Sequence, residues 1–91
     1  MTSIEDLEAA FRAAQAAVDG YVRQVTTQYR ERYPDSPDWK GQGPDPQAAL
    51  LRARWSPEES AELGRLREAA RRAVLELHRA RSAAAVTDTS S

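Results

Sequence analysis

The chain has 91 residues, a net charge of −1 and no cysteine, so it forms one domain at most, without disulfide bonds or thiolate metal sites. Its hydrophobic residues include 17 alanines, which bury little area per side chain. Acids and bases nearly balance within residues 1–33, 34–55 and 56–91, which argues against non-specific phosphate binding. We therefore expect no nucleic-acid partner and a core too small for a self-sufficient monomer.

The first predicted helix covers residues 3–33. Thr2 or Ser3 can cap its start, and Pro34 disfavours helical geometry at Tyr33, where the helix should end. Apolar residues recur at alternating spacings of three and four, which is typical of a helix that packs on another helix. This seam consists of Ile4, Leu7, Phe11, Ala14, Val18, Tyr21 and Val25.

Residues 34–45 form a connector that is rich in proline and glycine. Its tryptophan, Trp39, needs apolar cover and a hydrogen-bond partner, so we interpret the connector as an ordered corner. Asp45 and Pro46 are typical of a helix start, and they predict a short helix over residues 46–54.

The second long helix is predicted over residues 57–81. Ser56 at the N-cap, Pro57 at the first position and Glu59 at the third are the strongest start signal in the chain. Beyond it, residues 83–91 lose periodicity and are predicted to be a disordered tail. The single helical domain therefore spans residues 1–82.

Two long helices with a compact connection predict an all-α protein, an antiparallel helical hairpin with a short connecting helix. Because its core is small, we expect it to assemble as a homodimeric four-helix bundle or to pack on a larger protein partner through coiled-coil-like faces. The residues predicted to bind the partner are Leu7, Phe11, Val18, Tyr21, Val25, Leu63, Leu66, Val74 and Leu77.

The charged residues of the second long helix read as a solvated face. Glu68 lies four residues before Arg72, a spacing that forms ion pairs along a helix. His78 has no cluster of further ligands around it, so we predict no metal and no cofactor, and favour a non-enzymatic protein. No run is apolar enough for a membrane span or a signal peptide, which predicts a cytoplasmic location.

Aromatic residues gather near the predicted turn. They form either an accessory core that clamps the connector, or a ligand pocket or partner-binding patch with neighbouring basic residues available to an anion. The candidate patch is Tyr29, Tyr33, Trp39, Trp55, Arg30 and Arg52. The pocket requires Trp39 and Trp55 to converge with arginines on a concave site.

The stretch Trp39-Lys40-Gly41 resembles the W-x-G turn of the small helical-hairpin proteins that type VII systems secrete. This resemblance implies a secreted hairpin. In this chain Pro34 and Pro37 stand between the first helix and the turn. No tyrosine follows Tyr33 to supply that family's C-terminal Tyr-x-x-x-Asp/Glu signal.

The long–short–long order of helices is similar to that of the all-helical chorismate mutases, dimers that bind a dicarboxylate between arginines. That resemblance implies a small enzyme with its site at the turn, since basic residues lie at comparable places along the chain: Arg12, Arg30, Lys40 and Arg52. The isoleucine-aspartate pattern of that family's first helix is echoed only by Val18-Asp19. The leading hypothesis remains an accessory or regulatory interaction module, beside a ligand-binding protein or small enzyme and a secreted hairpin.

Overall fold

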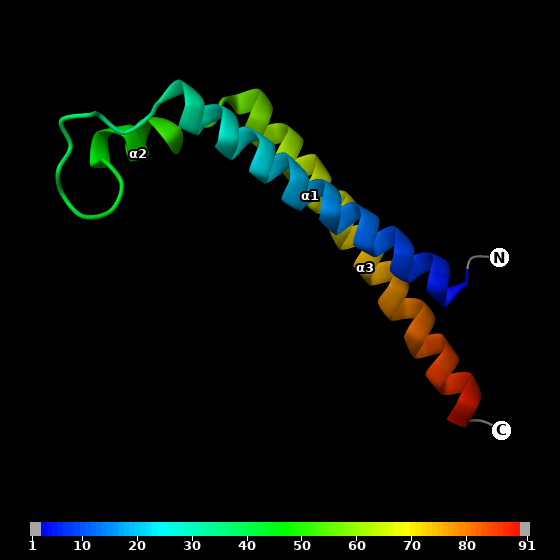
Figure 1. Cartoon of the computed structure of the whole chain (residues 1–91). Helices are drawn as coiled ribbons and strands as arrows, with labels where there is room; N and C mark the ends of the chain where they lie inside the picture. Colours follow the sequence, from blue (N-terminus) through cyan, green and yellow to red (C-terminus); the bar gives the residue numbers. More distant parts are fainter. Residues whose placement is uncertain (1–2, 90–91) are drawn as a thin grey trace.

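The two long helices lie side by side and run in opposite directions. The computed structural model describes residues 3–89, with side chains as far as Val86, and contains α1 (Ile4–Arg32), α2 (Pro46–Arg52) and α3 (Pro57–Thr89). Helices α1 and α3 pack on each other, while α2 and the connector before it extend beyond one end of the pair (Figure 1). The predicted all-α helical hairpin is confirmed.

Side chains cap the starts of both long helices. The Oγ of Ser3 accepts a hydrogen bond from the N–H of Asp6 at 3.1 Å. At the start of α3, the Oγ of Ser56 accepts from the N–H of Glu59 at 3.1 Å, and Glu59 Oε1 accepts from the N–H of Ser56 at 2.9 Å. These bonds satisfy donors that a helix start leaves without partners. Thr2, the other predicted cap of α1, lies outside the described residues.

The first two helices end close to their predicted positions. Tyr33 is the C-cap of α1, with φ −127° and ψ 70°, outside the helical region that the following Pro34 disfavours. Helix α2 ends at Arg52 rather than at residue 54. There the N–H of Arg54 donates to the carbonyl of Leu51 at 3.2 Å, a turn tighter than an α-helix that leads the chain out of α2.

Helix α3 is longer than predicted. It continues to Thr89 instead of ending near Arg81, so residues 83–89, which were predicted to belong to a disordered tail, are helical. Its last turns reach beyond the start of α1 (Figure 1). Residues 83–85 are three alanines, and alanine has the highest helix propensity of all residues. The high helix propensity of these alanines therefore extends α3, although the apolar repeat has ended. Residues 90 and 91 lie outside the described residues.

The apolar seam of α1 is covered by α3. Val18, Val25 and Tyr29 of α1 are buried, as are Ala70 and Leu77 of α3. Other residues predicted to contact a partner are half-buried: Leu7, Phe11, Tyr21, Leu63 and Leu66. The predicted partner-binding face is thus first of all the internal face of the hairpin.

The hairpin is long and its core is thin. Its radius of gyration is 20.1 Å and its extents are 70 × 28 × 15 Å, whereas a compact domain of this length has a radius of gyration of about 12 Å. No side chain in the described residues is fully buried. In a pair of helices each helix is covered by the other on one side only, so side chains are buried only along the line where α1 and α3 meet.

Two glycines lie within the long helices at positions where no neighbouring atom excludes a larger residue. A Cβ built on Gly20 of α1 or Gly64 of α3 would meet nothing within 4 Å. Each Gly→Ala change is therefore expected to raise the free energy of unfolding by about 0.5–1 kcal/mol through helix propensity alone. Urea unfolding followed by circular dichroism checks this, and a lower stability in either variant would contradict it.

Candidate functional site

Asp45 holds the connector to the start of α2 and is only 8% exposed. Its Oδ1 accepts from the N–H of Gln47 at 3.0 Å and caps α2, while its Oδ2 accepts from the N–H of Ser36 at 3.1 Å. The N–H of Asp45 in turn donates to Asp35 Oδ1 at 3.2 Å. One buried carboxylate therefore joins both ends of the connector, and the predicted ordered corner rests on it.

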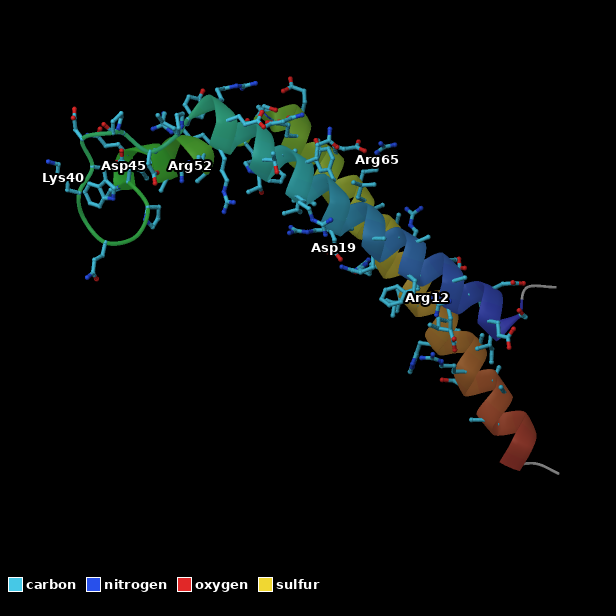
Figure 2. The ribbon with its side chains drawn as sticks, viewed as in Figure 1. Arg12, Asp19, Lys40, Asp45, Arg52 and Arg65 are labelled. Atoms are coloured by element: carbon cyan, nitrogen blue, oxygen red, sulfur yellow. The ribbon has the colours of Figure 1, made fainter. Side chains whose placement is uncertain are left out.

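Arg52 ties α2 to the end of α1. Its Nε donates to the carbonyl oxygen of Tyr33 at 2.8 Å, which satisfies an acceptor left open at the C-terminus of α1. Its Nη2 pairs with the carboxylate of Asp35. The hydrogen bond from Arg52, helped by the N–H of Asp45, holds the pKa of Asp35 below its usual value. Both charges of this pair are thus engaged in holding the corner, where Figure 2 shows Arg52 on α2.

Trp39 lies on the connector itself. Its Nε1–H donates to the carbonyl of Gly43 at 3.0 Å, and its ring covers Gly41, where a Cβ would come within 2.5 Å of the ring. Gly43 has φ 78°, in the left-handed region that favours glycine. The tryptophan and the two glycines thus form a local loop, with Lys40 at its far end (Figure 2).

The aromatic residues of the predicted patch lie in separate places. Trp55 meets Tyr21 edge-on, with ring centroids 6.2 Å apart, and Tyr29 meets Tyr33 at 6.1 Å. A hollow of about 450 Å³ beside Trp39 contains neither Trp55 nor an arginine. Its other lining residues are Ser36, Asp38, Asp45, Pro46 and Gln47. The structure does not bring together the two tryptophans that an aromatic pocket for an anion requires.

A groove lies along one side of the hairpin, between α1 and α3. Two hollows of about 740 and 190 Å³ share Phe11 and Val74, so they form one continuous groove. Val74 is 39% exposed there. The apolar floor of the groove consists of Phe11, Val18, Val22, Ala70, Val74 and Leu77.

Charged residues of both helices border this groove. Glu8 serves two arginines, accepting from Arg81 at 3.0 Å and lying 4.0 Å from Arg12. Arg23 and Arg67 have no salt bridge in the part of the chain that the structure describes. The full rim holds Arg12, Arg23, Arg67, Arg71 and Arg81, with Glu8 and Asp19 as its carboxylates.

Other arginines of α3 are paired along the helix. The predicted pair of Glu68 and Arg72 is present at 3.5 Å, and Arg71 lies 3.4 Å from the same carboxylate group. Arg65 pairs with Glu62 at 2.6 Å. The predicted pair of Glu68 and Arg72 is therefore confirmed, whereas Arg67 is exposed and forms no salt bridge among the described residues.

The sequence identified part of the floor of the groove but neither Val22 nor the rim. On α1 the rim row of Gln15, Asp19 and Arg23 runs beside the seam at a spacing of four, and on α3 Arg67 and Arg71 do the same. The spacing of four residues within each row can be read from the sequence. Which flank of one helix meets which flank of the other becomes evident only once the helices pack as an antiparallel pair.

No protein-family model, curated protein or solved structure matches this chain. We therefore infer a function from the residues of the groove and of the corner. Within residues 3–89, no group of three or more His, Cys, Asp or Glu residues could hold a metal ion, and His78 is exposed. None of the described helices has the length and apolarity that a membrane span requires.

Tyr29 and Glu59 join α1 to the start of α3. The hydroxyl of Tyr29 donates to Oε1 of Glu59, the same oxygen that accepts from the N–H of Ser56. The bond from Tyr29, followed by that from Ser56, holds the pKa of Glu59 below its usual value. The same bond, with burial, raises the pKa of Tyr29. The pair acts as a latch between the helices beside the corner.

The latch makes stability depend on pH. Because the pKa of Glu59 is lower in the folded chain, its contribution is complete above its unfolded-state pKa, about 4.3. It is lost as the pH falls through the folded-state pKa. Asp35 acts in the same direction. We expect the free energy of unfolding, measured with urea, to fall steadily below about pH 4.

Glu59→Gln removes the titration of the latch while keeping an acceptor for the cap, so the fall with pH should be smaller. The matched control is Glu58→Gln, which removes a carboxylate from the same turn. A Glu59→Gln variant with the full acid dependence of the natural chain would contradict the prediction.

Proposed function

We propose that the chain is a non-enzymatic helical interaction module, an accessory or regulatory subunit whose helix faces complete their burial on a protein partner. The observation that carries this proposal is the surface area. The chain exposes 7116 Å², whereas a compact monomer of 10.1 kDa exposes about 5,300 Å². The excess is larger than the about 800 Å² that one partner buries in a standard protein–protein interface.

Exposed apolar side chains support the same proposal. Leu50 and Leu51 of α2 are 66% and 40% exposed, and Val74 and Leu75 of α3 are 39% and 44% exposed. Val74 lines the groove, whereas Leu75, the next residue of α3, lines neither of its hollows, so the two side chains face different sides. A partner, either a second copy or a larger protein, would cover at least one of these sides.

The geometry of the corner supports a binding module more than a small-ligand site. Arg52 and Asp35 neutralise each other, and Trp39 is bonded within its own loop. Arg52 and Trp39, two members of the predicted anion-binding patch, are thus used to fix the connector. The groove, by contrast, presents both apolar surface and charges without partners.

The test is the stability and the mass of the chain on its own. At micromolar concentration we expect either a dimer or larger species in sedimentation velocity, or a monomer with a free energy of unfolding below about 5 kcal/mol. If a second copy is the partner, the melting temperature should rise with concentration. A monomer that unfolds cooperatively within the ordinary range of about 5–15 kcal/mol would contradict the proposal.

A further inference from the structure

The groove between α1 and α3 is basic, although the chain as a whole has a net charge of −1. Its rim carries five arginines and two carboxylates. One of the carboxylates, Glu8, is already shared between Arg12 and Arg81, and the other, Asp19, accepts from Gln15 at 3.3 Å. Arg71 lies 3.4 Å from Glu68 of its own helix. Arg23 and Arg67, on opposite helices, form no salt bridge within the described residues. The groove therefore has cationic groups available for an anionic partner.

The floor of the groove is apolar, which defines the kind of anion. Phe11 and Val74 line both hollows, and Val74 is 39% exposed. A phosphate backbone would leave this floor without apolar contacts. A helix with an apolar stripe between two rows of carboxylates would cover the floor and meet the rim at once.

A second copy of the chain fits the groove poorly. A two-fold dimer apposes the same surface of both subunits, so it would bring the five-arginine rim against itself. Like charges that face each other across an interface oppose association. The groove is therefore complementary to a different, acidic surface.

We propose that this groove binds an acidic amphipathic helix of another protein, whose apolar stripe covers Val74 and whose carboxylates pair with Arg23 and Arg67. The helix would lie as the third member of a bundle, with ridges of side chains packed into the groove. This inference rests on the proposed interaction function and names the chemistry of the partner.

Two synthetic helical peptides of about three heptads test it. Both carry leucine along one stripe, flanked by glutamate in one peptide and by lysine in the other, and the like charges keep each peptide from self-association. Fluorescence anisotropy of the labelled peptides, titrated with the full chain, measures binding. We expect the glutamate peptide to bind at least about tenfold more tightly than the lysine peptide. Its affinity should also weaken with added salt.

Charge reversals locate the binding. Arg23→Glu and Arg67→Glu should each weaken the glutamate peptide about tenfold and strengthen the lysine peptide. Arg65→Glu is the matched control, because Arg65 extends from the other side of the hairpin from Asp19 of the rim (Figure 2). Arg65→Glu should leave the peptide affinity unchanged. Val74→Asp should weaken binding about 100-fold, and circular dichroism verifies that each variant is folded.

Several results would overturn the inference. The inference fails if the two peptides bind equally well, or if Arg65→Glu and Arg67→Glu have equal effects. It also fails if the natural chain forms a dimer that Val74→Asp dissociates, or if a single-stranded oligonucleotide binds as tightly as the glutamate peptide. If neither peptide binds while the chain self-associates through another face, this inference fails and the proposed function stands. If the chain alone is a fully stable monomer, the proposed function fails whatever the peptides do.

Discussion

Leu77→Ala is expected to lower the free energy of unfolding by about 2–5 kcal/mol. Leu77 is 3% exposed and lies in α3 on the face that packs against α1. The substitution removes buried apolar area and leaves a cavity that the surrounding residues fill only in part. In a chain of this length, each kcal/mol shifts the melting temperature by about 4–8 °C, so a drop of at least about 8 °C is expected by circular dichroism.

Leu75→Ala is the matched control, since it makes the same change two residues away on α3. Leu75 is 44% exposed, and alanine is a slightly better helix former than leucine. We expect this variant to stay within about 0.5 kcal/mol of the natural chain. If the two variants were equally unstable, the line of burial along α3 would be placed wrongly.

The sequence predicted what local chemistry and periodicity decide. The start of α3 depends on bonds between Ser56 and Glu59, three residues apart, so the capping pattern was sufficient to place it. The burial of Val18 and Val25 follows in the same way from the spacing of apolar residues along α1. Both signals lie within a few helical turns, and no tertiary information was needed.

The sequence predicted an ordered corner over residues 34–45 but not the contacts that close it. The corner is closed by bonds from Asp45 to Ser36 and from Arg52 to Tyr33, which join residues far apart in the chain. These bonds place Trp39 on its own loop, away from Trp55, and no periodic pattern carries that information. The rim of the groove was missed for the same reason, because Arg23 and Arg67 become neighbours only through the packing of α1 on α3.

Asp45→Ala is expected to open the corner and leave the hairpin intact. The change removes the cap of α2, at about 0.5–2 kcal/mol. It also leaves the part-buried N–H of Ser36 without its acceptor, at about 1–3 kcal/mol. With at least about 1.5 kcal/mol lost locally, the amides of Ser36 and Gln47 should exchange with solvent at least about ten times faster.

Asp38→Ala separates this effect from a general loosening of the connector. Asp38 is an exposed acid in the same segment, and no hydrogen bond to its carboxylate is present among the described residues, so the exchange of Ser36 and Gln47 should not change. Amides of the buried seam, such as that of Val25, should keep their protection in both variants, because α2 packs on α1 alone and α3 is untouched. Unaltered exchange at Ser36 and Gln47 in Asp45→Ala would refute the role of the carboxylate. Loss of protection at Val25 would show instead that the corner and the hairpin unfold as one cooperative unit.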